Sequence, residues 1–265
     1  MLVGGTLLRL MDLNLAEANR EQARFLPPSR IVEQSDVLYT VSGTRCPGGP
    51  FNSVIGVGAG CPDPEATLAH ARAFYGELGR GFTVYVRAHV DRPLGAACEH
   101  DGLSQMSDAP GMVLRARVPA PPLPPSVEIR ELRSVSETSA FVDVAASAYS
   151  SIGLPAEITR KVYSMPERWL LPHLRVVVAF DHEEPAAAAM LHFSHGIAGV
   201  YWVGTAPSAR GKGLATAVMR HVSNLAFEHG AAAVVLQATP YGEPVYRKLG
   251  YQEVTRYPWY MAARQ

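Results

Sequence analysis

The chain has 265 residues, and its 24 lysines and arginines balance its 24 aspartates and glutamates, so the formal net charge is zero. This length suits about two domains, and a hydrophobic content of 48% allows both to bury a core. The balanced charge argues against the basic surface of a protein that binds nucleic acid or an anionic membrane, and we expect neither partner.

The N-terminus and the cysteines indicate the compartment. Asp12 and Glu17 interrupt the first apolar residues, so this segment has the pattern of neither a signal peptide nor a membrane span, and we expect a cytoplasmic protein. The three cysteines, Cys46, Cys61 and Cys98, form no C-x-x-C pair. They therefore predict free thiols in a reducing compartment and no metal site.

The first half of the chain predicts a mixture of helices and strands. Asp63 is a suitable N-cap, Pro64 fits the first helical position, and Gly79 fits just past the helix end. Runs of alternating apolar residues indicate the strands. The expected helices cover residues 12–25 and 63–78, and the expected strands cover residues 37–41, 52–57 and 81–87.

A proline-rich segment separates the two halves. Residues 118–126 contain five prolines, which can neither pair within a central strand nor continue a helix. Such a segment favours an extended, semi-rigid conformation. We therefore predict a first domain over residues 1–118, a linker over residues 119–126 and a second domain over residues 127–265. The alternative is a long surface loop within one domain.

The second half predicts an α+β fold with a mixed, mostly antiparallel sheet flanked by helices. Its first strands are joined by short connections and should pair antiparallel, whereas a later strand–helix–strand unit implies a parallel crossover. The expected strands cover residues 127–132, 174–180, 185–193, 197–205, 232–237 and 251–261, and the expected helices cover residues 136–150, 155–163, part of 207–230, and 243–249.

A glycine-containing loop carries the clearest functional signal. One strand ends near Thr205, and residues 210–215 then lead into a helix with an apolar stripe. The first turn of a helix has N–H groups without intrahelical partners and a partial positive charge, and glycines let a ligand approach the backbone closely. The loop therefore suits a pyrophosphate. Its spacing is that of neither a P-loop nor a Rossmann fold, and a flexible turn before a core helix is the alternative.

Two motifs together resemble the GNAT superfamily of acyltransferases. Arg210-x-x-Gly213-x-Ala215 resembles the family's acetyl-CoA signature R/Q-x-x-G-x-G/A, and residues 245–251 resemble its second signature, a short helix that ends in Leu-Gly-aromatic. The resemblance covers about half the chain and implies a GNAT-like acyl-CoA N-acyltransferase fold. The first half looks like a second, degenerate copy that lacks the signature, so the resemblance implies two tandem domains of which the first does not bind CoA.

The resemblance also implies roles for individual residues. Tyr246 takes the position of the family's general acid, and Thr239 stands where the family often has asparagine. Some members keep a carboxylate on the strand before the loop, but this strand has none; His192, His195 and Glu243 are the nearby alternatives for a base. The implied cofactor-binding positions are Val203, Gly204 and Thr205 for the pantetheine, Arg210, Gly211, Lys212, Gly213, Leu214, Ala215 and Thr216 for the pyrophosphate, and also Thr239.

These implications define the expected function. We expect an acetyl-CoA-dependent N-acetyltransferase that acts by direct attack of a primary amine of a small molecule or peptide, without a metal and with a homodimer as one arrangement. The alternative is a non-catalytic acyl-CoA-binding sensor or interaction protein, which the missing base and Thr239 favour. O-acylation and transfer of a longer acyl group also stay open.

Overall fold

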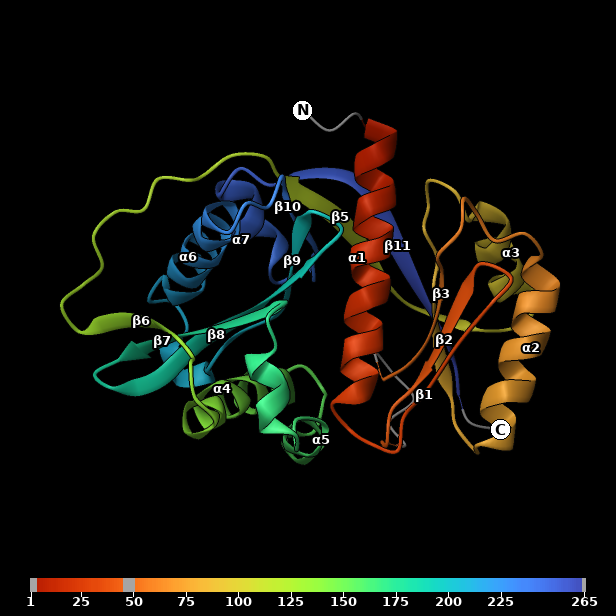
Figure 1. Cartoon of the computed structure of the whole chain (residues 1–265), viewed down its shortest axis with the longest axis horizontal. Helices are drawn as coiled ribbons and strands as arrows, with labels where there is room; N and C mark the ends of the chain where they lie inside the picture. The colour runs from red at the N-terminus through yellow and green to blue at the C-terminus, as the bar shows by residue number, and fades with distance from the viewer. Residues whose placement is uncertain (1–3, 45–50, 264–265) are drawn as a thin grey trace. The chain divides into compact units, whose positions relative to one another are not determined.

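The computed structural model describes residues 4–44 and 51–263, so Cys46 lies outside the described residues (Figure 1). The chain forms two compact units. Unit 1 consists of Met1–Met112, Gln237–Thr239 and Glu253–Gln265, and unit 2 consists of Val113–Leu236 and Pro240–Gln252.

Unit 1 is a sheet with the strand order β1-β2-β3-β4-β11-β5. Helix α1 packs over β2 and β3 with an apolar stripe that includes Leu7, Met11 and Leu15. Leu68, Phe74 and Leu94 of the other two helices pack with the strands in a second buried cluster. The elements are α1 (Gly4–Arg24), β1 (Arg30–Gln34), β2 (Val37–Val41), β3 (Asn52–Gly56), α2 (Pro64–Glu77), β4 (Phe82–Tyr85), α3 (Arg92–His100), β5 (Ser104–Leu114) and β11 (Gln252–Ala262).

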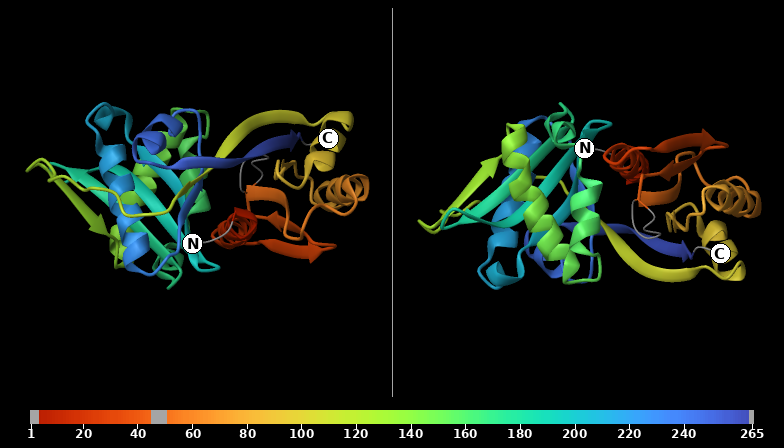
Figure 2. Two further views of the ribbon diagram at one scale, coloured as in Figure 1. Left: turned by 90° about the horizontal axis from the view of Figure 1, so that it is seen from above. Right: turned by 90° about the horizontal axis from the view of Figure 1, so that it is seen from below.

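Unit 2 is a sheet with the strand order β10-β9-β8-β7-β6, covered on both faces. Helices α4 and α5 lie on one face and α6 on the other (Figure 2). Because both faces are covered, the central strands β7 and β8 are almost continuously apolar. The elements are β6 (Val127–Glu131), α4 (Thr138–Ser150), α5 (Ala156–Val162), β7 (Leu174–Asp181), β8 (Glu184–Ser194), β9 (Ile197–Thr205), α6 (Leu214–Glu228), β10 (Val234–Gln237) and α7 (Glu243–Lys248).

Both units contain the same crossover between parallel strands. In unit 2, α6 connects β9 to the parallel strand β10, and in unit 1, α2 connects β3 to the parallel strand β4. The other pairs of unit 2, β6 with β7, β7 with β8 and β8 with β9, are antiparallel. The predicted fold class, a mixed and mostly antiparallel sheet flanked by helices, is therefore confirmed, and the shared crossover agrees with the expected two tandem copies.

The two units differ from the predicted domain limits at the C-terminus. The last strand, β11, pairs with β4 of unit 1 through Trp259↔Tyr85 and Tyr260↔Val84. The Tyr257 hydroxyl also donates to the buried Asp12 carboxylate of α1, at 2.8 Å. The contacts therefore group this strand with unit 1, whereas the sequence analysis placed the whole stretch 127–265 in the second domain.

The proline-rich segment also differs from the prediction. It belongs to unit 2 and runs beside α6, and Asn224 of α6 both donates to the Val118 carbonyl and accepts from the Val118 N–H, each at 2.9 Å. The division between the units precedes this segment, at Met112 and Val113. Residues 119–126 therefore group with unit 2, whereas the sequence analysis expected them to be a linker between two domains. No described helix is long and apolar enough to span a membrane.

Candidate active site

The carboxyl half of β9 is free of its parallel neighbour. The register of β9 with β10 consists of Ala198↔Val234 and Gly199↔Val235, whereas β9 continues to Thr205. A strand whose edge is released from its neighbour leaves backbone N–H and C=O groups that an extended ligand can pair with. The released part of β9 includes Val203, Gly204 and Thr205, the positions that the family resemblance implied for the pantetheine.

A bulge bends β9 at the same place. The pairing with β8 shifts between Ala188↔Gly204 and Met190↔Tyr201, and Trp202 has a positive φ of 53°. Such a conformation is unusual for a bulky side chain, and it costs energy that the surrounding packing must supply. The Trp202 ring packs at 4.8 Å from the Tyr149 ring of α4, which helps to hold the bulge.

Tyr149 is a residue that the sequence did not identify. Its hydroxyl donates to the Val203 carbonyl at 3.3 Å, and so ties α4 to the bulged strand. Burial, with a smaller electrostatic contribution from Tyr246, raises the pKa of Tyr149 well above its usual range. Two tyrosines therefore stand near this part of β9, on α4 and on α7. Gly204 serves the packing of α4, because a Cβ there would approach the Ala148 Cβ to 2.9 Å.

The loop after β9 presents an open helix N-terminus. After a short 3₁₀ turn, Gly211 and Gly213 take positive φ values of 78° and 77°, which favour glycine. Gly213 is the N-cap of α6, and no side chain caps the first turn. The N–H groups of Leu214, Ala215 and Thr216 occupy that turn, where intrahelical acceptors are absent. The space beyond Gly211 and Gly213 is empty to at least 4 Å, so an anion can approach the backbone.

The two cations of the loop have partners on the protein. The Lys212 ammonium lies 2.8 Å from the Asp181 carboxylate of β7, and its hydrogen bond lowers the pKa of Asp181. The Arg210 guanidinium donates to the Ser151 hydroxyl, just past α4. Both side chains therefore brace the loop, and the backbone N–H groups remain its main anion-binding feature.

Tyr246 is buried on the short helix α7. Its ring lies against Gly242, where a Cβ would come within 2.8 Å of the hydroxyl oxygen, and at 5.9 Å from the ring of Tyr251. Burial raises the pKa of Tyr246 well above its usual value, so the hydroxyl keeps its proton throughout the physiological pH range. Thr239 is exposed in the loop between β10 and α7 and groups with unit 1.

The three alternatives for a base lie in different surroundings. His195 is exposed in the turn between β8 and β9, at the opposite end of β9 from the bulge, so it is not placed for this role. Glu243 forms an ion pair with Arg247 at 2.7 Å. His192 is buried on β8 opposite Gly199, and its ring contacts those of His173 and Tyr201. Of the three, His192 is the one that is buried in the sheet of unit 2, next to β9.

The corresponding positions of unit 1 have no open helix N-terminus. The carboxylate of Asp63 caps α2 by accepting from Ala66 N–H at 2.9 Å, and Pro64 has no N–H to offer. A carboxylate at this position repels an anion and occupies a donor that a phosphate needs.

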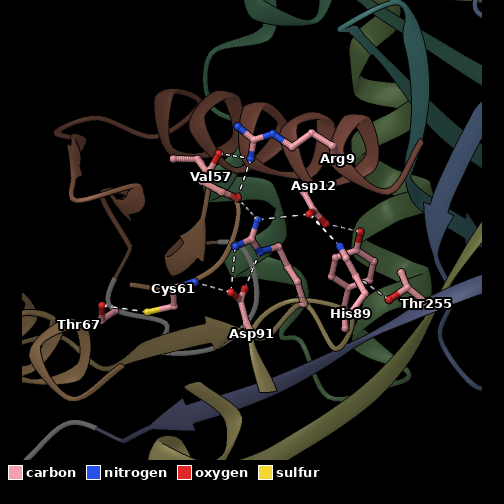
Figure 3. A network of polar contacts seen from close by, with 11 residues as sticks. Arg9, Asp12, Val57, Cys61, Thr67, His89, Asp91 and Thr255 are labelled. Atoms are coloured by element: carbon pink, nitrogen blue, oxygen red, sulfur yellow. Dashed lines mark hydrogen bonds and ion pairs between the residues drawn. The ribbon is translucent and has the colours of Figure 1, made fainter. Parts of the chain in front are cut away.

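A buried arginine also fills the end of β3 in unit 1. The Arg87 guanidinium lies against Gly56, donates to the Gly58 carbonyl at 2.9 Å and pairs with Asp91. Asp12 lies 3.3 Å from the same guanidinium and also contacts His89, at 3.1 Å (Figure 3). Side chains thus occupy the strand end that unit 2 leaves free. In the described ranges, no group of three His, Cys, Asp or Glu side chains is arranged to hold a metal ion.

Comparison with known proteins identifies the domain that carries the site. Residues 141–251 match the model of the acetyltransferase (GNAT) family. This part of the chain is a GNAT domain. The match contains β9, the glycine loop, α6 and α7. No curated protein matches the sequence.

Solved structures are similar to the whole chain and not only to the GNAT domain. A GCN5-related N-acetyltransferase from Kribbella flavida has a TM-score of 0.70 at 19% identity, over 93% of this chain and 94% of that chain. A GCN5-related N-acetyltransferase from Sphaerobacter thermophilus has a TM-score of 0.62 at 16% identity, over 98% and 92%. A tandem GNAT protein from the clavulanic acid biosynthesis pathway has a TM-score of 0.59 at 15% identity, over 99% and 95%. At these identities the likeness establishes the fold.

Proposed function

We propose that unit 2 transfers the acetyl group of acetyl-CoA to a primary amine of a small molecule or peptide. The observation that carries this proposal is the uncapped N-terminus of α6 next to the released end of β9. Together they suit a ligand that has a pyrophosphate and an extended amide-containing arm, because helix N–H groups bind the first and strand backbone pairs with the second. Acetyl-CoA has both parts.

The pantetheine arm would lie along residues 203–205 and bring the thioester to the bulge. The amine nitrogen attacks the thioester carbonyl carbon, and the carbonyl oxygen becomes an oxyanion that a backbone N–H near Val203 can stabilise. The tetrahedral intermediate then collapses, which forms the amide bond and breaks the carbon–sulfur bond. The proton lost by the amine passes to a base, for which His192 is the candidate, or to water.

Tyr246 would assist the departing sulfur. A free thiol has a pKa of about 8.5 and a free tyrosine one of about 10, and burial raises the pKa of Tyr246 further. Complete proton transfer from this tyrosine to a free thiolate is therefore uphill. Hydrogen-bond donation in the transition state, followed by protonation of the thiolate from solvent, agrees better with these values. Such assistance is typically worth about 10²–10⁴-fold in rate.

The proposal also covers unit 1, which we expect not to bind CoA. With a carboxylate on the N-terminus of α2 and Arg87 at the end of β3, we expect one CoA site per chain, in unit 2. A calorimetric stoichiometry of two acetyl-CoA molecules per chain would contradict this assignment.

Release of free CoA thiol from acetyl-CoA tests the activity. The unmodified protein and the Tyr246→Phe variant are each assayed with a panel of small amines and of peptides that have a free N-terminal amine. Acetyl-CoA binding to both proteins is measured in parallel. We expect release that depends on the amine and falls roughly 10²-fold or more in Tyr246→Phe while binding is retained. Binding without release from any acceptor would instead support an acyl-CoA sensor, and no binding would refute both functions.

A further inference from the structure

A threonine, a histidine and an aspartate form a chain of hydrogen bonds in unit 1. The Thr255 hydroxyl of β11 lies 2.8 Å from Nδ1 of His89, and Nε2 of His89 lies 3.1 Å from a carboxylate oxygen of Asp12 in α1 (Figure 3). The three residues come from separate segments of the chain, so only the fold brings them together. A hydroxyl, an imidazole and a carboxylate in this order are the parts of an acyl-transfer triad.

Strand pairing holds the histidine beside the threonine. The Ala88 N–H donates to the Arg256 carbonyl at 3.0 Å, so the antiparallel contact of β4 with β11 continues past the end of β4. The next residues on the two segments, His89 and Thr255, are therefore neighbours across the pair, and their side chains share a face. The hydrogen bond between them is thus a consequence of the backbone register and does not depend on a mobile side chain reaching across the surface.

The buried carboxylate of Asp12 fixes the position of the ring proton on His89. Tyr257 donates to the other oxygen of this carboxylate at 2.8 Å, and the Arg87 guanidinium lies 3.3 Å from the oxygen that His89 contacts. A carboxylate only accepts hydrogen bonds, so Nε2 of His89 carries the proton that faces it. Nδ1 is then the acceptor, and the Thr255 hydroxyl donates to it. In this direction the imidazole can take the proton of the hydroxyl as that oxygen attacks a substrate.

The burial of the three groups follows the order that this chemistry needs. The side chain of Asp12 is 2% exposed, that of His89 is 15% exposed, and Thr255 is half-buried. The carboxylate is therefore shielded from water, while the hydroxyl and one edge of the imidazole stay within reach of a small molecule. The two ring nitrogens are used in the opposite sense to a serine protease triad, in which the hydroxyl contacts Nε2. Either nitrogen can accept a proton, so the chemistry is the same.

We propose that unit 1 hydrolyses small acyl esters, with Thr255 as nucleophile, His89 as general base and Asp12 as the group that orients the imidazole. The Thr255 oxygen attacks the ester carbonyl carbon, and its proton passes to Nδ1 of His89. Collapse of the tetrahedral intermediate breaks the bond to the alcohol oxygen, which takes that proton and leaves. Water then attacks the acyl-threonine with His89 again as base, which releases the carboxylic acid and restores the hydroxyl. No step uses acetyl-CoA or unit 2.

A small alkyl fluorophosphonate tests the nucleophile on the full chain without acetyl-CoA. An activated hydroxyl attacks its phosphorus, fluoride leaves, and a stable phosphonyl ester stays on the oxygen. Mass spectrometry should show one added phosphonyl group per chain, and peptide mapping should place it on Thr255. Thr255→Val has nearly the same shape without the hydroxyl and should not be labelled, whereas Thr255→Ser should be. Ser107→Ala is the matched control, since Ser107 is a half-buried hydroxyl on β5 of the same unit, and it should leave labelling unchanged.

His89→Gln tests the base, because glutamine keeps a donor toward Asp12 but cannot take up the proton. Labelling of Thr255 and its turnover of p-nitrophenyl acetate, measured as the release that Thr255→Val loses, should both slow roughly 10²–10⁴-fold. Thermal unfolding checks that this variant keeps its fold. An unmodified protein without label on Thr255 would overturn the inference, as would equally fast labelling in a folded His89→Gln variant. Either failure leaves the acetyl-CoA proposal intact, because that proposal depends on unit 2 and is measured by thiol release.

Discussion

Replacement of Gly213 by aspartate and by asparagine isolates the charge at the N-terminus of α6. The two side chains have nearly the same size, and both tolerate the left-handed conformation that Gly213 adopts, with φ 77°. Nothing lies within 4 Å of the position a Cβ would take, so neither side chain collides with the protein. The cost of the left-handed conformation, about 1–2 kcal/mol or less for these residues, is shared by both variants.

The expected difference between the variants is electrostatic. Two unit charges about 4 Å apart repel by ~1 kcal/mol in water and by ~4 kcal/mol near a protein surface. Gly213 is exposed, so a value near the lower limit applies to each of the two phosphates. The total is about 2–3 kcal/mol, which corresponds to roughly 30- to 140-fold weaker binding of acetyl-CoA by the Asp variant than by the Asn variant.

Calorimetry with acetyl-CoA on both variants measures this ratio, and thermal unfolding controls for stability. The ratio should shrink as salt is raised, because exposed charges are screened. Similar affinities for the Asp and Asn variants at low salt would mean that the pyrophosphate does not bind at this turn. A large loss in both variants with unchanged unfolding temperatures would instead point to steric blocking of the backbone and would refute charge repulsion as the cause.

Three further predictions concern the tyrosines and unit 1. Tyr149→Phe removes the bond to the Val203 carbonyl, so it should cost about 0.5–1.5 kcal/mol in denaturant unfolding and slow thiol release with little change in acetyl-CoA affinity. Burial raises the pKa of Tyr246, so the protonated tyrosine persists as the pH rises. A plot of kcat against pH should therefore show no fall caused by deprotonation of Tyr246 below about pH 10. A fall near pH 8 that disappears in Tyr246→Phe would contradict this expectation. Arg87→Leu leaves Asp12 and Asp91 buried without their cation, so denaturant unfolding should show a loss of about 3–5 kcal/mol.

Most of the second half was predictable because its signals are local. Strand β9 was predicted with the limits that the structure has, and α7 and the other strands of unit 2 differ from their predictions by a few residues at their ends. Helix α6 lies within the range 207–230 in which a helix was expected. Glycine, proline and alternating apolar residues act within a few positions of the chain. In the first half, β1, α3 and β5 were missed, and these segments have polar or mixed patterns that periodicity does not separate from loops.

Long-range partners were not predictable from one sequence. The alternating pattern of β11 indicated a strand correctly but carried no information that β4 is its neighbour. Likewise, five prolines indicated an extended segment, but not that Asn224 would tether it to α6. Tyr149 stands on a predicted helix and has no motif around it. Its hydrogen bond to the Val203 carbonyl exists only in the folded unit.

Under the proposed function, the contrast between the two helix N-termini would explain why unit 2 binds a cofactor and unit 1 does not. Helices α2 and α6 follow equivalent strands, and the N-terminus of each carries a partial positive charge that a negative group stabilises. In unit 1 the Asp63 carboxylate stabilises the N-terminus of α2, and Arg87 occupies the adjacent strand end. In unit 2 the N-cap of α6 is a glycine, so no side chain stabilises this N-terminus and a bound anion can do so. A carboxylate cap stabilises its helix by about 0.5–2 kcal/mol, and unit 2 lacks this stabilisation until a ligand binds. Binding should therefore raise the unfolding temperature of unit 2 and leave the fold of unit 1 independent of the cofactor.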